Sequence, residues 1–159
     1  SRLREKRSSL RGHVRRGRKA PAPSRRPATD DSPAAECLRI ADAPRTRKAD
    51  EPERVTVKHV LVKWAGAKNA SPDVTRTREA ACLRAREART KLEQGASFAD
   101  VVKEYSDEPG AATREGLVGQ IERRDVNPAF ADAAFELKVG DVSYVVESPS
   151  GFHVIMRSE

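Results

Sequence analysis

The residues that could build a hydrophobic core are confined to the last two thirds of this 159-residue chain. All seven aromatic residues lie between positions 64 and 152, whereas residues 1–50 hold 15 Lys and Arg against 6 Asp and Glu. Six of the ten prolines precede position 53. A segment rich in Arg and Pro and poor in large apolar side chains cannot bury enough surface to offset its conformational entropy. The sequence therefore predicts a disordered basic tail over residues 1–53 and one folded domain over residues 54–159.

The predicted tail has two interpretations. Residues 1–26 carry 11 basic residues and one acidic residue, which would suit weak electrostatic contact with nucleic acid or another anionic surface. The alternative is a solvated or leader segment without a specific partner. We favour the second interpretation, because an Arg-rich composition is a non-specific signal.

Several classes of protein are disfavoured by what the sequence lacks. No run of 18 apolar residues predicts a membrane span, and no secretion signal is visible. Cys37 and Cys82 are too few for a metal cluster or a disulfide framework, and we expect Cys82 to pack as a small apolar residue. No metal site or cofactor is expected. Because the chain begins with Ser1, the compartment stays open: cytoplasmic by default, the cell envelope if a leader lies upstream.

The apolar pattern of the second part predicts an α+β domain. Alternating β-branched residues predict a strand first, helix-forming residues with capping residues follow, and two strands joined by a tight connection end the chain. Few strands separated by helices and ending in a hairpin are typical of an antiparallel-rich sheet with helices packed on it. The expected strands are residues 55–63, 117–121, 142–146 and 152–157, and the expected helices follow Thr75 or Thr77, Ser97 and Asn127.

Two histidines are the first candidates for a functional site. His59 lies in the first predicted strand and His153 in the last, and terminal strands of small α+β domains often meet at the centre of the sheet. Taken alone, each is more often a half-buried structural histidine than a catalytic one. Ser148 and Ser150 near His153 could suggest a hydrolase, but no orienting acid can be assigned to them. Glu108 is a carboxylate in a loop rich in Pro and Gly.

Nine short segments, in this order and spacing, resemble the parvulin-type peptidyl-prolyl cis–trans isomerases. Each segment alone is a weak signal, but together they cover nearly all of residues 55–158, and the tail has no part in them. The segments are residues 59–63, 75–81, 95–99, 105–110, 116–119, 127–130, 133–137, 140–143 and 150–155.

The resemblance implies a fold, an activity and a set of site residues. The fold would be a parvulin-like four-stranded antiparallel sheet wrapped by helices, and the activity would be isomerisation of X–Pro bonds in unfolded or extended protein segments. The family's histidine pair falls on His59 and His153, and the position that holds Cys or Asp in the family falls on Glu108. The hydroxyl positions fall on Ser148 and Ser150. The resemblance thus implies catalytic roles for the two histidines, Glu108 and Ser148. The implied substrate-binding positions are Ser150, Val118, Val126, Phe130 and Lys63.

Two positions of the expected proline pocket depart from the family pattern, and they bear on function. The proline pocket of the family is usually built from Leu, Met and Phe, and here two of those positions are Val. Loss of that side-chain volume weakens apolar burial by roughly 1 kcal/mol per site. A catalytically weak, chaperone-like peptide-binding module of the same fold is therefore the alternative to an active isomerase. In either case we expect proline-containing polypeptides as partners and a monomeric protein.

Overall fold

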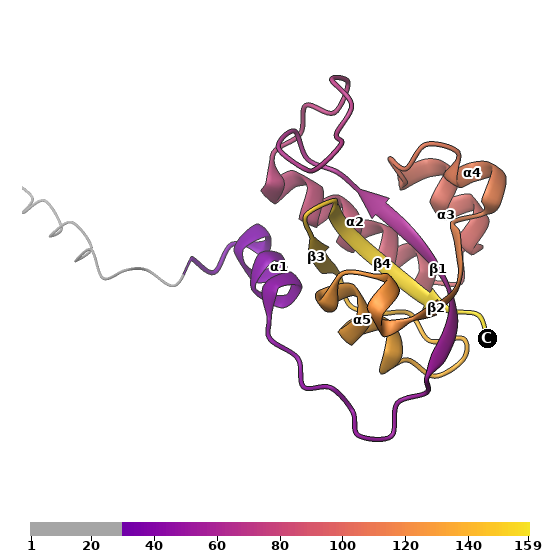
Figure 1. The fold of residues 1–159 in the computed structure, drawn as a ribbon. Coiled ribbons are helices and arrows are strands. Elements are labelled where there is room, and N and C mark those ends of the chain that lie inside the picture. The colour runs from indigo at the N-terminus through magenta and orange to yellow at the C-terminus, as the bar shows by residue number, and fades with distance from the viewer. Residues whose placement is uncertain (1–29) are drawn as a thin grey trace, which may run out of the picture.

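Four antiparallel strands form the centre of the molecule. The computed structural model describes residues 30–159, so the part of the predicted tail at residues 1–29 lies outside the described residues. The strands are β1 (Arg54–Val62), β2 (Leu117–Glu122), β3 (Val146–Ser148) and β4 (Gly151–Arg157). Their order across the sheet is β2-β1-β4-β3, so the first and last strands occupy the middle (Figure 1). The predicted four-stranded antiparallel sheet is confirmed.

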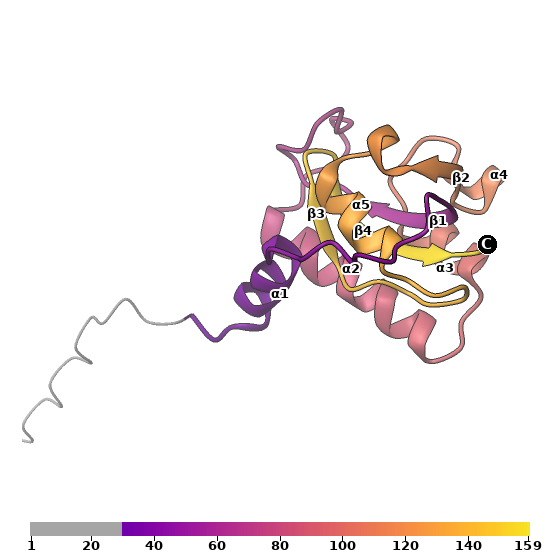
Figure 2. The ribbon, with the colours of Figure 1, turned by 60° about the horizontal axis from the view of Figure 1, so that its bottom comes forward.

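Helices cover both faces of this sheet, and Figure 2 shows the two layers. One face packs against α1 (Pro33–Asp42), α2 (Arg78–Glu93) and α3 (Phe98–Tyr105), with Val60, Val62, Phe152 and Val154 contributed by the strands. The other face packs against α5 (Pro128–Phe135). A one-turn helix α4 (Ala111–Arg114) and a short 3-10 helix η1 (Arg123–Asp125) flank β2.

The capping residues begin the helices where the sequence predicts. The side-chain oxygens of Thr77, Ser97 and Asn127 accept hydrogen bonds from backbone N–H groups in the first turns of α2, α3 and α5. Such caps satisfy donors that a helix start leaves unpaired. The sequence was less accurate near the end of the chain. Val142 forms only an isolated bridge to Met156, and the strand begins at Val146 rather than at residue 142.

The expectation of disorder up to residue 53 is wrong for residues 33–42, which form helix α1. Ser32 caps this helix, and its Cys37 and Ala41 are buried against α2. The structure also pairs Cys37 with Cys82, so Cys82 is part of a disulfide rather than a small apolar residue packed alone. A covalent link to the domain compensates for the small apolar surface of this segment, and composition does not reveal such a link. Within residues 30–159, no helix is long and apolar enough to span a membrane.

We expect the disulfide to be a large contributor to stability. It closes a loop between residues 45 positions apart, and the chain-entropy model gives about 4 kcal/mol for a loop of that length. Cys37→Ser/Cys82→Ser should therefore lower the free energy of unfolding by about that amount in urea titrations. The control is the unmodified protein in a dithiol reductant, which should fall to the same value. A double variant as stable as the oxidised protein would contradict this prediction.

Candidate active site

The pairing of β1 with β4 places the two candidate histidines side by side. In the register of this antiparallel pair, His153 lies opposite Leu61 and His59 lies opposite Ile155. Because side chains alternate between faces along a strand, His59 and His153 point to the same face of the sheet, the one that carries α5. Their rings stack with centroids 5.2 Å apart, and the two Nδ1 atoms are 3.0 Å apart. Two residues separated by 94 positions thus share one buried site.

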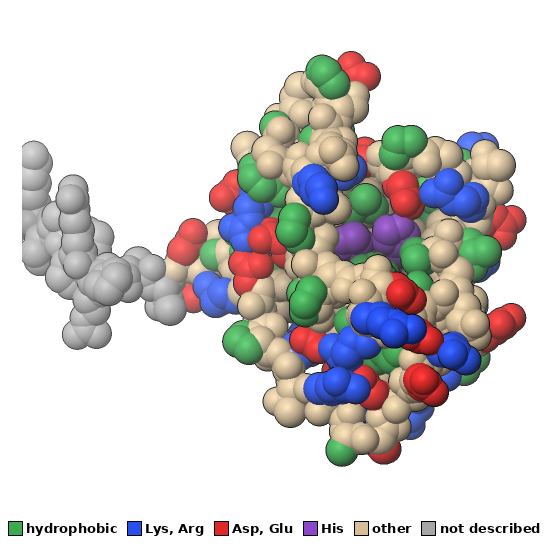
Figure 3. Space-filling view, viewed as in Figure 1, with side chains coloured by type: hydrophobic (Ala, Val, Ile, Leu, Met, Phe, Trp, Pro, Cys, Tyr) green, Lys and Arg blue, Asp and Glu red, His purple; other side chains and the backbone are tan. Residues whose placement is uncertain are grey.

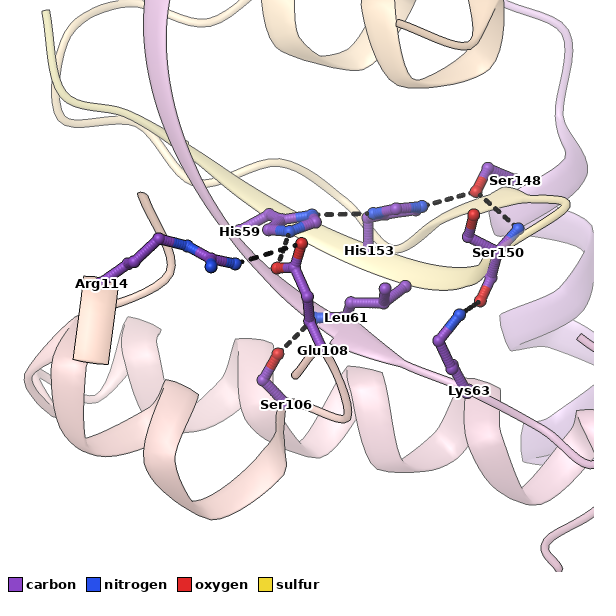
Figure 4. Close-up of polar contacts among 9 residues, drawn as sticks. All are labelled: His59, Leu61, Lys63, Ser106, Glu108, Arg114, Ser148, Ser150 and His153. Carbon is purple, nitrogen blue, oxygen red and sulfur yellow. Dashed lines mark hydrogen bonds and ion pairs between the residues drawn. The ribbon is translucent and has the colours of Figure 1, made fainter. Parts of the chain in front are cut away.

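A continuous row of polar contacts runs through these histidines (Figure 4). At one end, His59 Nε2 is 2.8 Å from a carboxylate oxygen of Glu108. At the other, His153 Nε2 is 2.6 Å from the hydroxyl of Ser148, which also accepts a hydrogen bond from the backbone N–H of Ser150. The four groups that the sequence nominated as catalytic therefore form one row, in which each group contacts the next.

One arrangement of protons satisfies every contact in this row when both imidazoles are neutral. Ionised Glu108 can only accept, so His59 donates from Nε2 and accepts at Nδ1 from His153, whose Nε2 then accepts from Ser148. Burial lowers the pKa of His153 well below its ordinary value, and the neighbouring His59 adds to this effect. The hydrogen bond from His59 lowers the pKa of Glu108 against the opposing effect of burial.

A cavity of about 390 Å³ opens above the two imidazoles, and Figure 3 shows them at the bottom of a hollow. Phe130 of α5 forms one wall and makes edge-to-face contacts with both rings, at centroid distances of 5.8 and 5.1 Å. Val118 and Val126 line the cavity, and both Ser148 and Ser150 border it. The site therefore combines an apolar wall with a floor of two imidazoles, and Glu108 and Arg114 add charged groups to its lining.

The loop before Glu108 is fixed to the edge of β1 beyond Lys58, where the pairing of β1 with β2 stops. The hydroxyl of Ser106 accepts from the N–H of Leu61, and Asp107 donates its N–H to the carbonyl of the same leucine. The Asp107 carboxylate accepts from the N–H of Lys63 and from Arg76, the latter at 2.6 Å. These bonds leave Glu108 little freedom to move away from His59.

The structure places one predicted substrate-binding residue elsewhere and adds three that the sequence did not nominate. Lys63 does not line the cavity, because its buried ammonium donates to the carbonyls of Lys68 and Ser150. The three additional lining residues are Arg114, Leu117 and Asn127. Arg114, the last residue of α4, is 3.5 Å from Glu108, and no local spacing signals this pair because only residues three or four apart are neighbours on a helix.

Comparison with known proteins identifies the family. A family model described as a rotamase, the PPIC-type PPIase domain, matches residues 59–159, nearly two thirds of the chain. The chain belongs to this family, the parvulin-type peptidyl-prolyl cis–trans isomerases. It is 38% identical over 115 residues to the peptidyl-prolyl cis–trans isomerase ESS1 of Saccharomyces cerevisiae, an alignment covering 68% of this chain and 67% of that protein. The sequence-based identification of the family and of its enzyme class is thereby confirmed.

Two further relatives place the parvulin fold in different settings. The peptidyl-prolyl isomerase ESS1 of Candida albicans superposes with a TM-score of 0.60 at 26% identity, covering 72% of this chain and 66% of that structure. The foldase PrsA of a Geobacillus strain is 42% identical over 71 residues, which cover 45% of this chain and 26% of the foldase. The chain thus spans about a quarter of that longer relative. Helix α1, which carries Cys37, precedes the part of the chain that the family model matches, whereas its disulfide partner Cys82 lies within that part.

The low pKa of His153 predicts a loss of stability in mild acid. Below the pKa of an exposed histidine, about 6.5, the unfolded chain takes up a proton that the folded chain refuses. The stabilisation is therefore complete above this pH and decreases as the pH falls, by about 1.4 kcal/mol per pH unit for one proton. Glu108, whose pKa is also lowered, loses its contribution only at more acidic pH.

Urea titrations between pH 7.5 and 5.5 measure this dependence. The free energy of unfolding should decrease over this interval, and His153→Gln should reduce the slope because an amide does not titrate. A free energy of unfolding that stays constant from pH 7.5 to 5.5 would contradict the prediction.

Proposed function

We propose that this isomerase binds the proline ring of an X–Pro segment in the cavity above the two histidines and accelerates rotation of the bond without covalent chemistry. The observation that carries the proposal is the contact of Phe130 with both imidazoles at the floor of a cavity open to solvent. Phe130, Val118 and Val126 would hold the ring. Unfolded or extended polypeptides are the substrates that such an open cavity suits.

The energetic task is to favour the twisted amide over both planar forms. Rotation is slow because the C–N bond has partial double-bond character, with a barrier of about 18–20 kcal/mol. In the twisted state this resonance is lost and less charge resides on the carbonyl oxygen. An apolar wall favours such a state relative to water, and only interactions stronger in the transition state accelerate the reaction.

The polar row would supply shape and electrostatic bias rather than proton transfer. In the proton arrangement given above, both ring N–H groups are donated within the row, so neither is directed at the substrate. Ionised Glu108, facing the cavity beside His59, would disfavour the planar resonance form that carries negative charge on the carbonyl oxygen. Ser148 would fix the ring of His153 through its hydroxyl.

The alternative is a peptide-holding module with little turnover, which the two valines in the cavity wall favour. Nuclear magnetic resonance exchange spectroscopy on a short proline peptide distinguishes the two. An active isomerase broadens or exchanges the cis and trans signals at substoichiometric concentrations. A holder shifts the signals on binding and leaves the exchange rate at its uncatalysed value.

Truncation of the aromatic wall should reduce catalysis more than neutralisation of the carboxylate. We expect Phe130→Ala to lower kcat/KM for a proline peptide by a larger factor than Glu108→Gln, because the ring contacts the floor and the substrate pocket together. Removal of a buried Phe also costs about 3–5 kcal/mol of stability, so folding is checked by circular dichroism. Val139→Ala, an exposed apolar truncation, is the matched control. Equal activity of Phe130→Ala and the unmodified protein would refute the pocket assignment.

We further propose that the protein is a monomer; for residues 1–29, the less favoured interpretation, a weak electrostatic tether, is the one that makes a testable prediction. The eleven basic residues of this segment would bind nucleic acid or another anionic surface weakly, without sequence preference. Deletion of residues 1–29 should leave isomerisation of a short peptide unchanged. The same deletion should abolish binding to a polyanion such as heparin, which in the full chain should weaken steeply with salt. Binding to heparin that survives the deletion would count against the tether.

A further inference from the structure

The segment that precedes the sheet is connected, through two arginines, to two elements that carry active-site residues. We call residues 33–53 the strap: helix α1 followed by the connection to β1. Figures 1 and 2 show it passing from α2 around α5 to the start of β1. Because the family model begins at residue 59, the strap lies outside the parvulin domain that it contacts.

One end of the strap is linked to the hairpin that carries Ser148 and His153. Arg78, the first residue of α2, donates two hydrogen bonds to the carboxylate of Glu147 in β3, at 2.7 and 2.8 Å. The same guanidinium donates to Asp42 at the end of α1, at 2.6 Å. Since side chains alternate along a strand, Glu147 points to the face covered by α1, α2 and α3, and its neighbour Ser148 points to the active site. Arg78 therefore connects α1 to the residue next to Ser148.

The other end of the strap is linked to the helix that carries Phe130. Arg123 donates to both oxygens of Glu51, at 2.9 and 2.8 Å, and to Asp132 of α5, at 2.6 Å. The side chain of Glu51 is only 7% exposed, so this carboxylate is largely removed from water. Asp132 lies two residues after Phe130. The strap thus contacts the aromatic wall through one arginine and the Ser148 hairpin through another.

The disulfide decides whether α1 stays in place. A helix of ten residues is marginal in isolation, and α1 buries only Cys37 and Ala41 completely. Its ion pair to Arg78 is partly exposed at Asp42, and exposed pairs contribute little. Without the covalent bond between Cys37 and Cys82, mainly the packing of Cys37, Ala41 and the partly buried Leu38 and the ion pair of Asp42 would keep α1 docked.

We propose that the strap is a redox-controlled positioning element of the active site. With the disulfide closed, the strap holds the Ser148 hairpin and the Phe130 wall at their working separation. A dithiol reductant opens it: the S–S bond breaks, each sulfur gains one electron and one proton, and the two thiols of the reductant join in a disulfide. Disulfides persist in oxidising compartments, so the closed state belongs to such a compartment. The inference rests on the proposed function for its activity readout.

The test compares the full chain in oxidised and reduced forms with four variants. Turnover of a proline peptide is measured by exchange spectroscopy, and the ring nitrogen signals of His153 report its hydrogen bond to Ser148. We expect reduction to lower turnover about threefold to tenfold and to shift the His153 signals. Cys37→Ser/Cys82→Ser should match the reduced protein and not respond to reductant.

Glu51→Gln isolates a link of the strap itself while the disulfide stays closed, because Glu51 belongs to the strap and binds Arg123 beside α5. It should lower turnover and shift the His153 signals in the oxidised form through the Phe130 wall, and Glu51→Asp should restore part of both. Lys91→Gln is the matched control, because it removes an ion pair between α2 and Glu104 that does not touch the strap. Its turnover should equal that of the unmodified protein.

Each outcome supports or overturns the inference. Equal turnover and equal His153 signals in the oxidised and reduced proteins would overturn it, as would an effect of Lys91→Gln as large as that of Glu51→Gln. If reduction unfolds the whole domain by circular dichroism, Glu51→Gln decides alone. If no form accelerates exchange, the proposed function fails instead, and the His153 signals still decide whether the strap positions the hairpin.

Discussion

The pairing of the first strand of the sheet with the last is the constraint on which the active site depends. Strands β1 and β4 supply the two histidines, and their register sets a stacking distance that neither strand could set alone. The contact spans 94 positions, so almost the whole domain must fold before the site exists. Such non-local pairing carries a large loop-closure cost, which the two helix-covered cores on either side of the sheet must offset.

The alternation of side chains along these strands then separates stability from function. On β4, Phe152 and Val154 enter the core beneath α2 and α3, while His153 faces the cavity. On β3, Glu147 points to the face covered by α1, α2 and α3, and Ser148 points to the active site. The groups that act on substrate therefore sit on rigid strands, and their neighbours in sequence anchor those strands to the helices.

The sequence predicted the features that local chemistry determines, and it failed where a long-range bond decides. Helix starts are indicated by residues whose side-chain oxygens can cap a helix: Thr77, Ser97 and Asn127. The period-two pattern around His59 indicates a strand. Helix α1 carries the same kind of start signal, Ser32 followed by Pro33, but its docking involves a disulfide to Cys82 that no local pattern reveals. Lys63 was misplaced for a related reason: its position in the motif is visible in the sequence, but the carbonyls that bind its ammonium belong to Lys68 and Ser150.

The row of polar groups across the site is anchored at both ends by the start of a single helix. A buried polar row is stable only when every member is satisfied, so its two ends must be held at a fixed separation. Arg76 binds Asp107, which fixes the loop of Glu108, and Arg78 binds Glu147, which fixes the strand of Ser148. These arginines flank Thr77, the N-cap of α2, and therefore move as one body. The N-terminus of α2 thus sets the length of the row, and whatever positions that helix end also positions the imidazoles between Glu108 and Ser148.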